Sequence, residues 1–153
     1  MIDIVVRCID CHIVNLQNKT PFYLILKRSN NKIYPDTWQC ITGKIKPPEK
    51  PIEAALREVN EETGLTPISI WSLDYVNQYY DHNNNSMNLI PVFGILVDIK
   101  EITLSKEHQN YKWLNFKAAK NKLLWDNQKK GLECFQEIIL NPKLEKNNIL
   151  KIL

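Results

Sequence analysis

Residues 43–65, GKIKPPEKPIEAALREVNEETGL, constrain the fold more than any other segment of this chain. Pro51 suits the first position of a helix, where its missing N–H costs no hydrogen bond. Gly64 suits the position just after a helix. Between them apolar residues recur at helical spacing, namely Ile52, Ala55, Leu56 and Val59. The segment therefore predicts a helix over 51–63, preceded by a loop that begins after Gly43.

Three glutamates, Glu58, Glu61 and Glu62, crowd the end of this predicted helix. Their spacing places them on one side, off the apolar stripe, and like charges four residues apart destabilise an isolated helix. One interpretation is a solvated acidic face that Arg57 partly neutralises. The other is a site for a hard cation, because Mg²⁺ takes oxygen ligands and bridges carboxylates to substrate phosphates. With no His or Cys nearby, Mg²⁺ or Mn²⁺ suits the cluster better than Zn²⁺.

Composition limits the classes of function open to the chain. Its 153 residues fit one domain, and a net charge of +3 with no Lys/Arg-rich block argues against binding to duplex nucleic acid. No apolar run approaches the roughly 18 residues of a membrane span, and the N-terminal residues lack the pattern of a signal peptide. Four scattered cysteines do not form a disulfide framework. We therefore expect a cytoplasmic protein with reduced thiols.

The rest of the chain divides into strand-like and helical segments. Apolar and β-branched runs predict strands over 2–16, 22–29, 37–43, 68–80, 87–99 and 111–116, the first being one strand or a bent pair. Helices are predicted over 117–125 and 127–140, and the tail from about 141 is expected to be loosely held. The pattern predicts a mixed sheet with helices on its faces, an α/β or α+β fold in a single domain over 1–153.

The order of residues around the glutamates matches a known motif. Gly43 is followed by five residues and Glu49, then by seven residues and the run REVNEETGL, in which Val59 and Leu65 are the bulky aliphatics. This order resembles the Nudix box, G-x5-E-x7-R-E-U-x-E-E-x-G-U, at every fixed position, where U is a bulky aliphatic residue. The resemblance implies a Nudix hydrolase, a metal-dependent enzyme with an α/β/α sandwich and a catalytic loop–helix–loop that cuts pyrophosphate linkages.

The same resemblance implies roles for the carboxylates. Glu58 and Glu62 would be the principal ligands of Mg²⁺ or Mn²⁺, with Glu61 a third. Glu49 would be a supporting carboxylate that orients Arg57 or a metal-bound water. The physical logic agrees, because metal ions neutralise phosphates and lower the pKa of bound water, and a carboxylate within reach can accept the proton.

Residues 104–119, LSKEHQNYKWLNFKAA, resemble an E-H-x-x-Y-[RK]-W-L segment of some Nudix subgroups. That resemblance makes Glu107 a candidate for a further metal ligand or the general base. For His108 a structural hydrogen-bonding role is favoured, because the carboxylates already supply metal ligands. The segment also occurs in dinucleoside tetraphosphate hydrolases, which are therefore the nearest rival within the enzyme interpretation.

Residues 38–45, WQCITGKI, resemble a signature of dATP pyrophosphohydrolases and dihydroneopterin triphosphate diphosphatases. That resemblance places Arg28 and Thr42 against substrate phosphates or the metal shell, and Trp38 and Gln39 at the border of the pocket. Gly43 would shape the loop at the substrate. The loop departs from the usual Nudix pattern at positions 47 and 48, where two prolines remove N–H donors.

These residues predict a Mg²⁺-dependent pyrophosphohydrolase that converts a nucleoside or pterin triphosphate into a monophosphate and pyrophosphate. The alternatives are a dinucleoside tetraphosphate hydrolase, a non-hydrolytic nucleotide-binding module on the same fold, and an isomerase on the same scaffold. Small-molecule nucleotides or pterins are the expected partners, with no membrane and no duplex nucleic acid. The sequence does not determine the oligomeric state, for which a homodimer is the commonest arrangement.

Overall fold

The computed structural model describes all 153 residues and contains one mixed sheet of eight strands with four helices. The strands are β1 (Asp3–Val5), β2 (Cys8–Gln17), β3 (Thr20–Arg28), β4 (Trp38–Gln39), β5 (Ile41–Lys44), β6 (Ser69–Asp81), β7 (Ser86–Val97) and β8 (His108–Leu114). The helices are α1 (Pro51–Thr63), α2 (Phe116–Lys122), α3 (Asp126–Leu140) and α4 (Glu145–Ile149). No helix is long and apolar enough to cross a membrane.

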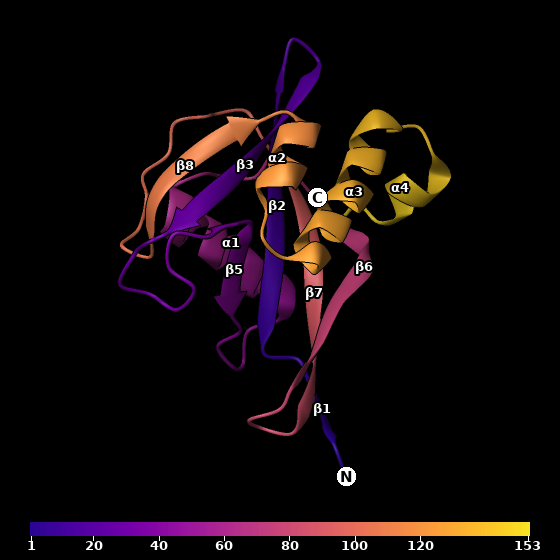
Figure 1. Cartoon of the computed structure of the whole chain (residues 1–153). Helices are drawn as coiled ribbons and strands as arrows, with labels where there is room; N and C mark the ends of the chain where they lie inside the picture. The colour runs from indigo at the N-terminus through magenta and orange to yellow at the C-terminus, as the bar shows by residue number, and fades with distance from the viewer.

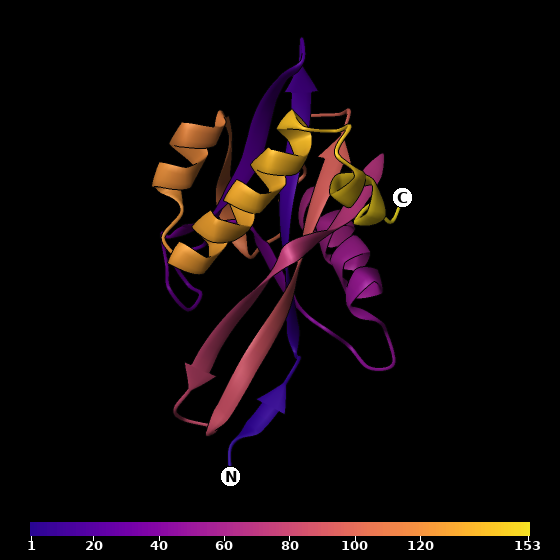
Figure 2. The same ribbon diagram turned by 90° about the vertical axis from the view of Figure 1, so that its right-hand side faces the viewer.

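The sheet forms the middle layer of three, with α1 on one face and α2 and α3 on the other (Figures 1 and 2). Two buried clusters fill the spaces between the layers. The first joins Ala55 and Val59 of α1 to inward residues of β2, β3 and β7. The second joins Leu132 and Phe135 of α3 to the opposite face of the same strands. This arrangement confirms the predicted α/β/α sandwich with a mixed sheet.

Strand pairing brings distant parts of the sequence to the end of α1. Strand β2 lies between β7, with which it is parallel, and the antiparallel strands β3 and β5. The loop from β7 to β8 then crosses the C-terminal end of α1, where the N–H of Thr103 donates to the carbonyl of Thr63 at 3.0 Å. Two contacts continue this path, from the Ser105 N–H to the Glu62 carbonyl at 3.4 Å and from the Ser29 N–H to the Glu107 carbonyl at 2.9 Å.

Helix α1 has the bounds that its sequence predicts, but it is rotated relative to the predicted stripe. The Lys50 N–H donates to the Glu53 carboxylate at 2.7 Å at the start, and Gly64 adopts φ 73° at the end. Leu56, predicted to face the core, is 38% exposed, whereas Glu62 is only 2% exposed. Ala54 and Ala55 pack directly on the sheet, so the buried side of the helix also contains Val59 and Glu62. The prediction that Glu62 lies off the apolar side is therefore wrong.

The C-terminal segment differs from the prediction of a loosely held tail beyond residue 141. It forms α4 and then runs beside β6, where the Ile152 N–H donates to the Ile70 carbonyl at 2.7 Å and the Ser72 N–H to the Leu150 carbonyl at 3.0 Å. Asn147 is 2% exposed. The reason is the open edge of β6, whose unpaired backbone groups accept another strand.

Two buried polar residues of β2 face α3, outside the segment that resembles the Nudix box. His12 lies against Gly131. A Cβ added to that glycine would be 2.8 Å from His12 Nε2. Asp10 shares this face of the strand and is 3% exposed, with one hydrogen bond, from Asn77 Nδ2 at 2.9 Å. Burial raises the pKa of Asp10 from 3.8 to about 6, and the Asn77 hydrogen bond only partly opposes the shift.

Asp10 should make the protein less stable as the pH rises. The folded state keeps the Asp10 proton at pH values where the unfolded chain has lost it, so stability falls between about pH 4 and pH 6, by about 3 kcal/mol in total. Asp10→Asn should abolish this loss. The check is urea unfolding at about pH 4 and about pH 7. Asp74→Asn, at a side chain that is 69% exposed, is the control and should keep the wild-type pH dependence. An unchanged pH dependence in Asp10→Asn would contradict the assignment.

Candidate active site

Glu58 lies directly over the backbone of β5, and Gly43 makes this contact feasible. A Cβ added at Gly43 would lie 2.3 Å from both Cγ and Cδ of Glu58, closer than any real contact. Gly43 pairs with Ile9 of β2, so its backbone cannot withdraw from the helix without breaking the sheet. A larger residue at position 43 would therefore displace the Glu58 side chain from this position.

Arg57 organises the loop and the helix through all five of its N–H donors. It forms a fork with Glu49, Nε to Oε2 at 3.1 Å and Nη2 to Oε1 at 2.7 Å. Nη1 donates to Glu58 at 2.7 Å and to Glu61 at 3.2 Å, and Nη2 also donates to the Lys44 carbonyl at 2.8 Å. The hydrogen bonds from Arg57 hold the pKa of Glu49 at about 2. Glu49 is thus a fixed anion that orients Arg57.

Glu62 is the most unusual carboxylate of the protein. Its side chain is 3% exposed and both carboxylate oxygens lack a hydrogen-bond partner. Burial raises its pKa well above the ordinary range, and the neighbouring Glu107 and Glu58 raise it further. A buried, unpartnered polar group costs free energy, so this position is unfavourable unless another group satisfies it.

Glu107 reaches the site from the loop before β8. Its backbone carbonyl accepts from the Ser29 N–H, which fixes the loop, while its side chain is exposed and makes no ion pair. Its negative charge lies close enough to Glu62 to raise the pKa of that carboxyl. The structure therefore brings Glu107 together with Glu58 and Glu62, as the sequence predicts for a residue 45 positions beyond Glu62.

His108 and Gln39 lie buried beside Glu62. The two Nε2 atoms of Gln39 and His108 are 3.2 Å apart, and His108 Nδ1 is 3.5 Å from Glu62 Oε2. Burial lowers the pKa of His108 to about 4, so the ring is neutral near pH 7. Gln39, predicted to border a substrate pocket, is only 4% exposed. The reason is that the short strand β4 pairs with β3 and turns Gln39 toward β8.

The other predicted substrate residues divide between the two faces of the sheet. Arg28 pairs with His108 and lies close enough to lower the pKa of that ring, which places it on the α1 side, with Nε donating to the Ile33 carbonyl at 2.7 Å. Thr42 pairs with Asp10 and so faces α3. Trp38 packs against the α3-side cluster, with the Nζ atoms of Lys112 and Lys122 each 5.4 Å from its ring centroid. The fold thus separates Trp38 and Thr42 from the glutamates by the thickness of the sheet.

The carboxylates are chemically suited to Mg²⁺ or Mn²⁺. Glu58, Glu61, Glu62 and Glu107 offer only oxygen donors, which these cations prefer. The two unpartnered oxygens of Glu62 are the observation that fits a bound cation. No three acidic, imidazole or thiol groups converge as a finished cage, since Arg57 engages Glu58 and Glu61. A cation would therefore compete with Arg57 for these two side chains.

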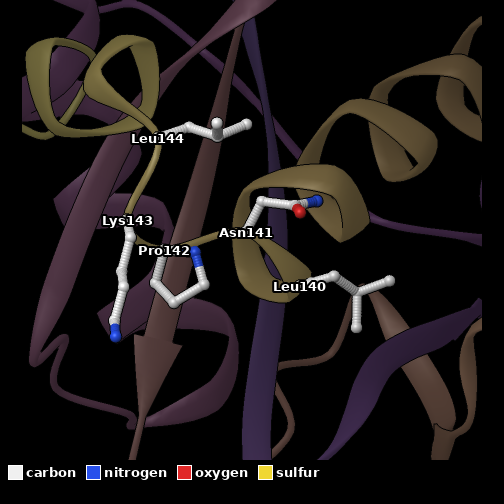
Figure 3. Close-up of a pocket in the computed structure, with 5 residues that line it drawn as sticks. All are labelled: Leu140, Asn141, Pro142, Lys143 and Leu144. Carbon is white, nitrogen blue, oxygen red and sulfur yellow. The ribbon is translucent and has the colours of Figure 1, made fainter.

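A hollow lies elsewhere, at the turn between α3 and α4 (Figure 3). It has a volume of about 420 Å³ and is lined by the consecutive residues 140–144. Lys143 is the only charged side chain of this lining. The hollow contains none of the carboxylates described above, so it does not mark their site.

Comparison with known proteins identifies relatives that match most of this chain. A family model described as NUDIX domain matches residues 7–135. Nucleoside triphosphatase NudI of Klebsiella pneumoniae (strain 342) is 28% identical over 123 residues, which cover 75% of this chain and 86% of that protein. The asymmetrical bis(5'-nucleosyl)-tetraphosphatase of Rattus norvegicus is 30% identical over 111 residues, covering 70% of this chain and 73% of that protein.

Solved structures share the fold. Among them, the Escherichia coli dihydroneopterin triphosphate pyrophosphohydrolase matches with a TM-score of 0.70 at 23% identity, over 92% of this chain and 99% of that chain. The two proteins therefore have the same overall fold.

Proposed function

This chain belongs to the NUDIX family and is a Nudix hydrolase, and from that premise we propose that it hydrolyses a phosphoanhydride bond of a nucleoside triphosphate or of dihydroneopterin triphosphate. Mg²⁺ is the proposed cofactor, with Mn²⁺ as a substitute. The products are the monophosphate and pyrophosphate. The resemblance of residues 38–45 to enzymes for dATP and dihydroneopterin triphosphate supports this choice of substrates.

One observation carries the proposal. Glu62 is buried with two unpartnered carboxylate oxygens, beside Glu58 and Glu107. A protein gains nothing in stability from such an arrangement, because Glu62 is desolvated and the charges of Glu58 and Glu107 repel it. A divalent cation removes both costs at once. The arrangement therefore supports a metal-binding role for Glu58, Glu62 and Glu107, with Glu61 at the exposed rim.

Each residue of the site then has a defined task. The bound cation would neutralise phosphate oxygens and lower the pKa of a coordinated water. The oxygen of the attacking water forms a bond to phosphorus as the P–O–P bond breaks, and a carboxylate takes the water proton. Glu58 and Glu107 are the two candidate bases. Glu107 makes no ion pair, whereas Glu58 is bound to Arg57 at 2.7 Å, so Glu107 is the freer acceptor.

Arg28 is the proposed phosphate contact on the same side of the sheet. Its Nε donates to the Ile33 carbonyl at 2.7 Å, which fixes the direction of the guanidinium, while its Nη groups make no hydrogen bond to the protein. An arginine fork held in this way suits phosphate oxygens. Trp38 and Thr42 lie on the α3 side, across the sheet from the glutamates, so neither is proposed to contact the phosphates.

The proposal is tested by a Mg²⁺ assay of dATP, the other dNTPs, dihydroneopterin triphosphate, diadenosine tetraphosphate and ADP-ribose side by side. We expect Mg²⁺-dependent release of pyrophosphate from at least one triphosphate. Tight binding without turnover of any compound, with Mg²⁺ and with Mn²⁺, would instead favour a non-hydrolytic nucleotide-binding module.

A dinucleoside tetraphosphatase is the second candidate function. The rat relative and the E-H-x-x-Y-K-W-L segment that contains Glu107 and His108 favour it. In the same assay this activity would convert diadenosine tetraphosphate into two nucleotides with no release of pyrophosphate. The products of the preferred compound therefore distinguish the two candidates directly.

A further inference from the structure

Gln39 and His108 form a buried row that ends at Glu62. Gln39 is 4% exposed, His108 5% and Glu62 2%. His108 Nε2 faces Gln39 Nε2 at 3.2 Å, and His108 Nδ1 faces Glu62 Oε2 at 3.5 Å. No other hydrogen bond satisfies either His108 Nδ1 or the Glu62 carboxylate. His108 Nδ1 and Glu62 Oε2 are therefore the nearest available hydrogen-bond partners of each other.

The hydrogen-bond polarity of this row decides the tautomer of His108. The amide nitrogen of Gln39 can only donate, so His108 Nε2 must accept. A neutral imidazole has one donor and one acceptor nitrogen. The ring proton consequently resides on Nδ1, and the N–H points at the Glu62 carboxylate.

We propose that Gln39 and His108 are positioning residues that hold the Glu62 carboxylate for the metal: Gln39 fixes the His108 tautomer, and the Nδ1–H of His108 orients Glu62. The proposal rests on the metal-binding role proposed for Glu62 above. Residues behind a metal ligand commonly fix its orientation, and their loss typically weakens metal binding about 10–100-fold. Neither residue touches the reacting atoms in this scheme.

The surroundings of Glu62 explain why such a hold is needed. Glu58 and Glu107 both repel its charge, and no lysine or arginine is paired with it. Arg28 and Glu107 are the charged groups near the His108 ring, apart from Glu62 itself. The 3.5 Å separation is longer than an ordinary hydrogen bond, and neither atom has another partner. Hydrogen bonds in metal-free and substrate-free sites are often long and tighten when the site is loaded.

The first test measures the tautomer in the metal-free protein. Long-range ¹H–¹⁵N correlation spectra distinguish a ring protonated at Nδ1 from one protonated at Nε2. We expect the Nδ1–H form for His108, with the signal assigned by its loss in His108→Asn. A ring protonated at Nε2 would overturn the proposal, whatever activity the enzyme shows.

The second test compares two substitutions that each keep a nitrogen at one of the two ring-nitrogen positions of His108. An asparagine amide nitrogen can take the place of Nδ1, whereas a glutamine amide nitrogen can take the place of Nε2. Titration calorimetry with Mn²⁺ should give near wild-type affinity for His108→Asn. His108→Gln should bind Mn²⁺ about 10-fold or more weakly. Equal affinities for the two variants would overturn the role of Nδ1, and matched thermal unfolding curves check that both fold.

The role of Gln39 is tested by coupling. Gln39→Met removes the amide at similar size and should weaken Mn²⁺ binding in the wild-type background. It should have no further effect in a His108→Leu background, because Gln39 acts through His108. Additive losses would overturn this step. Failure of the parent function is distinguishable, since it would appear as no turnover of any substrate by wild-type protein that binds Mn²⁺ and carries the Nδ1–H tautomer.

Discussion

Glu58→Gln is expected to lower kcat by about 10²–10⁴-fold, the range for loss of a group that handles a proton in the reaction. Glutamine keeps the size of the side chain but removes the charge that would bind the cation and that pairs with Arg57 at 2.7 Å. The measurement is kcat with the best substrate at saturating Mg²⁺. Undiminished Mg²⁺-dependent turnover would remove Glu58 from the site.

Glu53→Gln is the matched control for this substitution. Glu53 lies on the same helix, is exposed, and accepts the Lys50 N–H at 2.7 Å. Glutamine serves equally well at this capping position. The control should therefore retain wild-type turnover and a wild-type unfolding midpoint. A loss in both variants would indicate a general effect of removing charge from α1.

Gly43→Ala is expected to lower kcat by about 10²-fold, the effect of displacing a reacting group by about 1 Å. The new Cβ would stand 2.3 Å from Glu58 Cγ, so the carboxylate must move. Gly43 does not have a positive φ, and its backbone can accept a side chain. The defect should consequently appear in turnover and in Mn²⁺ affinity more than in the free energy of unfolding.

Gly64→Ala should give the opposite result. A Cβ there would meet only Thr103 at 3.7 Å, which is ordinary contact, but the residue has φ +73°. The left-handed conformation costs an alanine roughly 1 kcal/mol. We expect reduced stability in urea unfolding with turnover unchanged. If Gly64→Ala lost turnover as severely as Gly43→Ala, the specific contact between Gly43 and Glu58 would not explain the defect.

The sequence predicted α1 to the residue because its ends carry local signals. Pro51 and Gly64 have backbone preferences that do not depend on the rest of the molecule. The tail beyond residue 141 was less predictable, because its order depends on backbone hydrogen bonds with the edge of β6. Such pairing depends on a strand that is distant in the sequence, so the tail carries no local signal for it. The same limit applies to Gln39, whose burial depends on the pairing of β4 with β3.

The sequence by itself determined the family and the helix that carries most of the candidate carboxylates, because the order of residues 43–65 and the signals at the helix ends are local. Only the tertiary structure decided how these charges differ. It buries Glu62, leaves Glu61 half exposed and pairs Glu58 with Arg57 in an ion pair. The physical reason is that desolvation depends on what packs against a side chain, here the sheet and the loop that contains Glu107. The row from Gln39 through His108 to Glu62 likewise exists only because β4, β8 and α1 meet.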